Sequence, residues 1–186
     1  MKTCVISFSS RADGNCAAIA DCVQETLGAE GLTRFDFSGL SVHGCGACHC
    51  ECFRQREACP YFADDAFLLN EAAALADRAV FIVPNYCDFP CSNFFLFNER
   101  SQCCFNGHAE LADRYLAVPK KFIVVSNTGR ENFLAAFRDH VLPGTEPDVC
   151  FLRAAAYHRI SLDGDMMMIV SGLMYAIYLV LSKPDW

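Results

Sequence analysis

Short apolar runs alternate with helical patterns along almost the whole chain, and this alternation limits the possible folds more than any other feature. Strand-like runs are predicted at residues 3–8, 32–37, 79–84, 122–126 and 149–156. The run 79–84, Ala-Val-Phe-Ile-Val-Pro, is the clearest, because it is continuously apolar and ends at a proline, as strands buried on both faces do. Such strands joined by helices form a parallel sheet covered on both faces. We therefore predict an α/β, doubly wound, three-layer fold with five parallel strands.

The helices between these runs are predicted from apolar spacing and capping residues. They cover residues 15–27, a segment from Asp64 or Asp65 to about 77, and 92–116 with a break near Asn106-Gly107. Thr128-Gly-Arg-Glu131 matches a capping box and predicts a helix that continues to Leu142. The repeated strand–helix order without a linker or repeat indicates one domain over residues 1–186, with a cysteine-rich loop at 43–60.

Composition excludes several classes of protein. With 53% apolar and 20% charged residues the chain is expected to be compact, and its net charge of −7 argues against a nucleic-acid partner. The first residues enter a strand-like run without a secretory leader, so we expect a cytoplasmic protein. In that compartment thirteen cysteines are expected as reduced thiols or metal ligands instead of disulfides.

Residues 166–181 form an uncharged stretch of sixteen residues. A membrane-spanning helix needs about 20 apolar residues, so no membrane span is predicted. A helix covered by the sheet on one side and by a second subunit on the other explains the uniform hydrophobicity better. This favours a homo-oligomer.

In doubly wound sheets ligands bind at the carboxyl ends of the strands, which selects the loops at residues 9–15, 43–60, 85–91 and 127–130. The first loop, Ser9-Ser-Arg-Ala-Asp-Gly-Asn-Cys16, has neither a nucleoside-triphosphate nor a dinucleotide fingerprint. It is rich in hydroxyls and leads into a helix, where free amides favour a single phosphate. A polar turn with a helix cap is the alternative interpretation.

This loop resembles the S-P-R-x-x-G-N-T phosphate loop of the NADPH-dependent FMN reductases, a branch of the flavodoxin-like superfamily, with Ser10 for Pro and Cys16 for Thr. Cys45-Gly-Ala-Cys48 through Cys59 and Asp64-Asp65 resemble the cysteine segment of the iron–sulfur flavoprotein branch. Residues 76–86 resemble the family's strand and loop beside the flavin, and residues 94–100 occupy the place of its K-x-F-x-D-R helix. The resemblance implies a flavodoxin-like sheet of strand order 2-1-3-4-5, and a homodimer or homotetramer.

The resemblance also implies the residues that contact FMN. Tyr86 would cover the isoalloxazine face, although an aromatic in this place also suits simple rim packing. The full predicted set is Ser9, Arg11, Gly14, Asn15 and Cys16 in the first loop, Pro84, Asn85, Tyr86, Cys87 and Asp88 in the second, and Ser126, Asn127, Thr128 and Gly129 in the third.

The cysteine loop has the spacing C-x2-C-x-C-x-C-x6-C. The resemblance implies a [4Fe-4S] cluster on Cys45, Cys48, Cys52 and Cys59, with Cys50 as the alternative to Cys52, because Glu51 occupies the family's third ligand position. The same thiolates suit zinc, and a loop without metal is the third possibility. Cys103 and Cys104 are adjacent on a predicted helix and cannot both face one way, so they are expected to be poor joint ligands.

The resemblance thus implies an FMN-dependent NAD(P)H oxidoreductase that passes electrons from a pyridine nucleotide to an unidentified acceptor. The flavin carries that chemistry, so no catalytic side chain is expected. Two alternatives stay open: an FMN/iron–sulfur electron-transfer protein without NAD(P)H activity, and a flavin-less metal-binding or redox-sensing protein.

Overall fold

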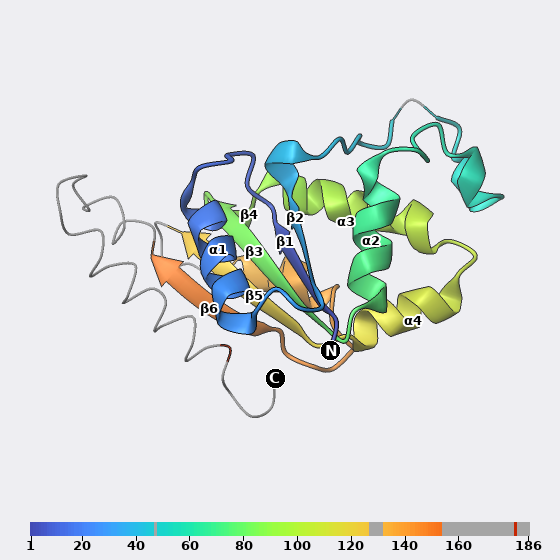
Figure 1. Ribbon diagram of the computed structural model, residues 1–186. Coiled ribbons are helices and arrows are strands. Elements are labelled where there is room, and N and C mark those ends of the chain that lie inside the picture. The colour runs from blue at the N-terminus through green and yellow to red at the C-terminus, as the bar shows by residue number, and fades with distance from the viewer. Residues whose placement is uncertain (47, 127–131, 154–180, 182–186) are drawn as a thin grey trace, which may run out of the picture.

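The sheet has five parallel strands in the predicted order. A computed structural model describes residues 1–46, 48–126, 132–153 and 181. The strands β1 (Thr3–Ser7), β2 (Leu32–Asp36), β3 (Arg78–Tyr86), β5 (Lys120–Ser126) and β6 (Asp148–Arg153) lie in the order β2-β1-β3-β5-β6 (Figure 1). Counted among the parallel strands alone, this is the order 2-1-3-4-5, which confirms the fold prediction. The short strand β4 (Phe89–Pro90) pairs antiparallel with the end of β3 and was not predicted.

The helices occur in the predicted order, and the helix predicted to reach Leu142 is shorter than expected. They are α1 (Asn15–Leu27), α2 (Asp65–Leu75), α3 (Ser92–Phe105), α4 (Ala109–Ala117) and α5 (Phe133–Arg138), with 3-10 turns η1 (Phe37–Gly39), η2 (Glu51–Phe53) and η3 (Arg56–Ala58). The predicted break near Asn106-Gly107 is confirmed, because Gly107 has a φ of 75° between α3 and α4. Helix α5 ends four residues before Leu142, and the capping box 128–131 lies outside the described residues.

Alternating residues of each strand face opposite layers, as the period of two in a strand requires. Val5, Val80 and Ile123 pack toward α1, whereas Ile6, Phe81 and Phe122 pack into the larger core beneath the other helices. Figure 1 shows α1 on one face of the sheet and α2, α3 and α4 beyond the other. Both faces are therefore covered, which explains why the strands read as continuous apolar runs.

The terminal apolar segment is described at one residue. Leu181 is buried in the cluster on the α1 face, which agrees with the predicted contact of this segment with the sheet. Residues 166–180 lie outside the described part of the chain. Among the helices that the structure describes, none has the length and apolar character needed to cross a membrane.

Candidate functional site: a rim cavity and a thiol cluster

A cavity of about 300 Å³ opens at the carboxyl ends of β1, β3 and β5. This is the edge at which parallel α/β sheets bind ligands. Its lining contains nine of the predicted FMN contacts and two further residues, Asp13 and Val125. The lining residues are Ser9, Arg11, Asp13, Gly14, Asn15, Cys16, Pro84, Asn85, Tyr86, Val125 and Ser126. The cavity, referred to below as the rim cavity, therefore joins the first loop, the end of β3 and the end of β5. Of the third predicted loop, Asn127, Thr128 and Gly129 lie outside the described residues.

The first turn of α1 faces the rim cavity with its amides uncapped. Gly14 is the N-cap residue, and no side chain in the described chain caps the helix. The Gly14 carbonyl accepts hydrogen bonds from the amides of Ala17 and Ala18, which leaves the amides of Asn15 and Cys16 ahead of the first helical bonds. Uncapped amides at a helix N-terminus attract anions.

Hydrogen bonds from α3 hold the first loop in place. Asn93 Nδ2 donates to the Phe8 carbonyl and to Ser10 Oγ, both at 2.9 Å. The Arg11 amide donates to Ser9 Oγ at 3.1 Å, which closes the turn from within. The loop is thus shaped before any ligand binds, which lowers the entropic cost of binding.

Asn85 presents an unused acceptor beside the rim cavity. Its Nδ2 donates to Ser126 Oγ at 3.1 Å, and this bond joins the ends of β3 and β5. Its Oδ1 is buried and, within the described residues, has no hydrogen-bond partner. Buried polar atoms are almost always paired, so an orphaned oxygen that borders a cavity indicates a missing donor. A flavin has such donors in its ring N–H and its ribityl hydroxyls.

Cys87 and Asp88 do not line the rim cavity, unlike the other predicted residues of the second loop. Strand β3 runs on to Tyr86, and the chain then reverses in a two-residue turn that pairs Tyr86 with Phe89. Cys87 and Asp88 are the centre of this turn, with φ of 51° and 68°. Two positive φ values are typical of the type I′ turn, which matches the twist of a hairpin. The hairpin could not be predicted from the sequence, because such turns normally contain Asn-Gly.

Cys16 lines the rim cavity although its side chain is buried against the α1-side core. Burial, and to a lesser extent the proximity of Cys91, raise the pKa of the Cys16 thiol to about 12. The side chain therefore stays neutral at physiological pH. What this position offers a ligand is its amide.

The predicted metal ligands are divided between the surface and the interior. Cys45 and Cys50 are exposed and Cys48 is half-buried, whereas Cys52 and Cys59 are buried in a cluster with Cys103 and Cys104. We call the four buried residues the thiol cluster. Nowhere in the described residues do three or more His, Cys, Asp or Glu side chains form a group with metal-binding geometry. The structure thus does not support the iron–sulfur set predicted from the loop.

Cys103 and Cys104, which the sequence predicts to be poor joint ligands, both lie in the interior. Both are on α3, both are about 2% exposed, and both belong to the thiol cluster. Side chains of neighbouring residues on a helix point about 100° apart. Because α3 packs against both α2 and the cysteine loop, both side chains are nevertheless buried. Their place beside the cysteine loop has no signal in the sequence, because it depends on how α3 packs against that loop.

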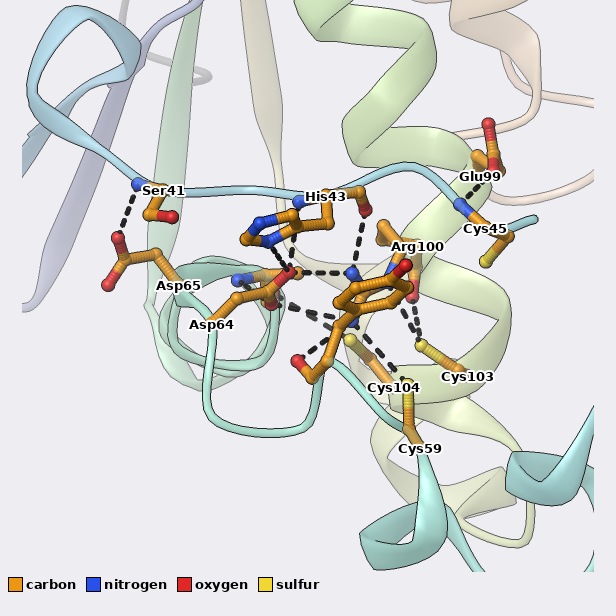
Figure 2. A network of polar contacts seen from close by, with 12 residues as sticks. Ser41, His43, Cys45, Cys59, Asp64, Asp65, Glu99, Arg100, Cys103 and Cys104 are labelled. Carbon is orange, nitrogen blue, oxygen red and sulfur yellow. Dashed lines mark hydrogen bonds and ion pairs between the residues drawn. The ribbon is translucent and has the colours of Figure 1, made fainter. Parts of the chain in front are cut away.

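Arg100 on α3 is fully buried and organises this region. Its guanidinium donates to Asp64 Oδ2 at 2.6 Å, to the His43 carbonyl at 2.7 Å and to the Tyr61 carbonyl at 3.2 Å. It also approaches Cys103 Sγ at 3.5 Å and Cys59 Sγ at 3.8 Å. In Figure 2 the guanidinium lies between Asp64 on one side and the sulfur atoms on the other. Asp64 and Arg100 each fall within a segment of the family resemblance, but nothing in the sequence predicts that they pair.

The thiols around Arg100 differ sharply in acidity. The hydrogen bond from Cys104, together with the Arg100 guanidinium, lowers the pKa of Cys103 to about 6, although burial opposes deprotonation. The same hydrogen bond and burial raise the pKa of Cys104 well above its usual value. In its neutral form the Cys103 thiol donates to the Arg100 carbonyl at 3.1 Å. Anionic character is thus favoured at Cys103, next to the guanidinium.

Comparison with known proteins establishes the fold. No protein-family model and no curated protein sequence matches the chain. Among solved structures, the chain is similar to the protein Smu.1420 from Streptococcus mutans, with a TM-score of 0.62 and 14% identity over 96% of this chain and 100% of that one. It is also similar to a protein described as a putative quinone reductase from Klebsiella pneumoniae, with a TM-score of 0.61 and 14% identity over 98% and 86% of the two chains.

A third similar structure is FerB, described as a flavoenzyme NAD(P)H:(acceptor) oxidoreductase from Paracoccus denitrificans. Its TM-score is 0.55, with 14% identity over 97% of this chain and 96% of that one. At this level of identity the likenesses establish the architecture alone. Together with the strand order they show that the described residues have the flavodoxin-like fold.

Proposed function

We propose that this protein is an FMN-dependent NAD(P)H oxidoreductase, which passes electrons from a pyridine nucleotide through bound FMN to an acceptor. The observation that carries the proposal is the rim cavity, which combines uncapped helix amides with the orphaned Oδ1 of Asn85. These two features match the two polar ends of FMN, its phosphate and its ring with hydrogen-bond donors.

The phosphate end of the ligand is assigned to the first loop and α1. The amides of Asn15 and Cys16 and the Ser9 hydroxyl are donors, and the α1 dipole adds favourable potential. Arg11 and Asp13 both line the cavity, so their opposite charges offset each other. Binding of the phosphate then rests mainly on backbone amides, as in other phosphate loops.

The ring end is assigned to the ends of β3 and β5. Asn85 accepts a hydrogen bond from the flavin, and Tyr86, whose side chain is 59% exposed, offers an aromatic surface at the rim. FMN supplies the hydride and electron chemistry when it is bound. The chain's own residues bind and orient it, and Asn85 holds the ring in a position that its bond to Ser126 fixes.

The similar structures support the choice of electron donor. FerB is described as an NAD(P)H:(acceptor) oxidoreductase, and the Klebsiella pneumoniae protein as a putative quinone reductase. Both have the present fold over nearly the whole described chain. A pyridine nucleotide as donor and a quinone-type acceptor are therefore the first substrates to test.

The proposal includes a second subunit beside the flavin. Tyr86, Phe89 and Phe95 lie on the β3–β4 hairpin and on α3, and each exposes between 43% and 59% of its surface. Exposed aromatic residues of this kind are typical of protein interfaces. In a homodimer or homotetramer they would be covered, and water would be excluded from the ring.

The test begins with protein purified without oxygen and supplied with FMN. We expect one FMN per chain, and saturable oxidation of NADPH or NADH when a quinone is present. If the protein bound FMN but oxidised neither nucleotide, it would be an electron-transfer protein without NAD(P)H activity. Failure to bind FMN would refute the proposal.

A pair of matched variants tests the phosphate end directly. Gly14→Asp places a carboxylate at the N-cap of α1, whereas Gly39→Asp adds the same charge in η1 away from the rim cavity. We expect Gly14→Asp to weaken FMN binding strongly and to leave riboflavin, which lacks the phosphate, nearly unaffected. Gly39→Asp should change neither affinity. Equal losses for FMN and riboflavin in Gly14→Asp would contradict the assignment.

A further inference from the structure

We propose that Cys59 and Cys103 form a redox-active pair, which hydrogen peroxide converts into a disulfide and a thiol reductant restores. The thiol cluster lies outside the rim cavity, and the proposed flavin chemistry does not use it. Close packing of small side chains does not require a buried cation, yet the cluster is arranged around the guanidinium of Arg100. This inference does not depend on the binding of FMN.

The two sulfur atoms converge on Arg100 from different parts of the chain. Cys103 is on α3 and Cys59 directly follows η3, and the guanidinium approaches both sulfurs. Both residues belong to the same buried cluster. Figure 2 shows both side chains directed at the same side of Arg100. The geometry thus brings together two thiols and a fixed positive charge, which stabilises a thiolate.

Cys104 is not the partner of Cys103, although it is adjacent. Consecutive Cα atoms are about 3.8 Å apart. The usual Cα separation in a disulfide is about 4.4–6.8 Å, so this pair cannot close within an intact helix. Cys59 lies across the cluster, and a bond to it would join the end of the cysteine loop to α3.

The surroundings select a small oxidant. Cys103 is about 2% and Cys59 about 8% exposed, which excludes bulky disulfides such as oxidised glutathione. A cavity of about 90 Å³ lies next to the cluster and is lined by Cys104, Phe62 and Phe67 among others. A water molecule takes about 30 Å³ in the liquid, so a molecule of hydrogen peroxide fits in this space.

The chemistry balances without any other reactant. The Cys103 thiolate attacks one peroxide oxygen, the O–O bond breaks, and the departing hydroxide takes a proton to become water. Cys103 is then a sulfenic acid. The Cys59 sulfur attacks the Cys103 sulfur, an S–S bond forms, and the S–O bond breaks. The leaving hydroxide takes the Cys59 proton, so two thiols and one peroxide give one disulfide and two waters.

The experiment uses the full chain, reduced, freed of reductant and treated with one equivalent of hydrogen peroxide. Remaining thiols are blocked with an alkylating agent, and mass spectrometry of the peptides identifies the products. We expect a Cys59–Cys103 cross-link as the main product, and its loss after dithiothreitol. A main cross-link between other cysteines, or oxidation confined to exposed residues such as Cys45, Cys50 and Cys87, would overturn the proposal.

Variants separate reactivity from folding. Cys103→Ser should abolish the cross-link, whereas Cys22→Ser, on α1, should leave it unchanged. Arg100→Met should slow its formation at least about tenfold, which equals about 1.4 kcal/mol in the barrier. Arg100→Lys, which keeps the charge, should recover part of the rate. If Arg100→Met does not fold, the cross-link in the wild type and its loss in Cys103→Ser still show whether Cys59 and Cys103 form the disulfide. Stoichiometric iron or zinc that protects Cys59 and Cys103 from the blocking agent would overturn the proposal in favour of metal binding.

Discussion

The rim cavity and the thiol cluster are built on different physical principles. The rim cavity is formed where parallel strands end, and its donors are mainly amides and an asparagine beside Ser126. The thiol cluster is formed by side chains that surround one buried cation, Arg100. The rim cavity depends on the topology of the sheet, which many sequences can produce. The thiol cluster depends on single residues, so substitutions in it are expected to affect folding as well as chemistry.

The charge balance around Arg100 shows this dependence. The side chain of Asp64 is 4% exposed and that of Arg100 is 0% exposed, so neither charge is screened by water. Asp64 is also the N-cap of α2, and its carboxylate accepts hydrogen bonds from the amides of Ala66 and His43. One carboxylate therefore fixes a helix start, the cysteine loop and the guanidinium together.

Arg100→Met is expected to have the largest effect on stability. It leaves Asp64 buried without its cation, and breaking a buried pair from one side costs about 3–5 kcal/mol. Urea unfolding followed by circular dichroism measures this loss. The control is Arg138→Met, which breaks an exposed pair with Glu146 and should cost less than about 1 kcal/mol. Equal effects of the two variants would contradict the central place of Arg100.

Thiolate absorbance should distinguish the two regions next. Cys103, with a pKa of about 6, gains its negative charge as the pH rises through 6, whereas Cys16, with a pKa of about 12, stays protonated. The ultraviolet thiolate signal of the folded protein should therefore fall by one group per chain in Cys103→Ser at pH 8. Cys16→Ser should leave that signal unchanged. If Cys103→Ser kept the full thiolate signal, the negative charge would not be on Cys103.

Asn85→Ala should affect ligand binding more than folding. It removes an acceptor that is unpaired in the described structure, together with the bond to Ser126. We expect FMN binding to weaken by about 1–3 kcal/mol, which is roughly 5- to 150-fold in Kd. Fluorescence titration of FMN measures the affinity. Asn98→Ala, on α3 and outside the lining of the rim cavity, is the control and should bind FMN like the wild type.

The smallest expected effect concerns backbone strain in the loops near the two regions. Cys87 in the hairpin turn and Cys50 before η2 have φ of 51° and 58°, a region that asparagine tolerates better than cysteine. Cys87→Asn and Cys50→Asn should each raise the free energy of unfolding by up to about 1 kcal/mol. Cys45→Asn, where φ is not positive, should give no gain. Thermal unfolding compares the three variants, and a gain in Cys45→Asn alone would contradict the explanation.

The sheet and most helix positions could be predicted from the sequence because they depend on local patterns. Buried parallel strands need continuous apolar runs such as residues 79–84, and α1 was predicted with its observed bounds, Asn15–Leu27. The first loop and the end of β3 were predicted for the same reason, since strand ends follow from strand positions. The predicted capping helix proved shorter in its described part, because capping signals mark starts better than ends.

The hairpin at Cys87-Asp88 and the thiol cluster could not be predicted in this way. The turn is formed by Cys-Asp and lacks the Asn-Gly or Asp-Gly pair that marks such hairpins in a sequence. The thiol cluster joins Cys59 to Cys103, forty-four positions further along the chain. Spacing within one loop is uninformative about a partner on a distant helix.

The sequence by itself determined the order of strands and helices, the edge of the sheet at which the rim cavity opens, and the first loop and the end of β3 that line it. Each follows from hydrophobic period and chain connectivity, which are local properties. Only the tertiary structure decided which cysteines meet, which carboxylate pairs with Arg100, and that the side-chain oxygen of Asn85 has no donor within the described residues. The first two outcomes depend on how α3 packs against α2 and the cysteine loop, and the third on how the ends of β3 and β5 lie together. Such packing is set by the whole core at once.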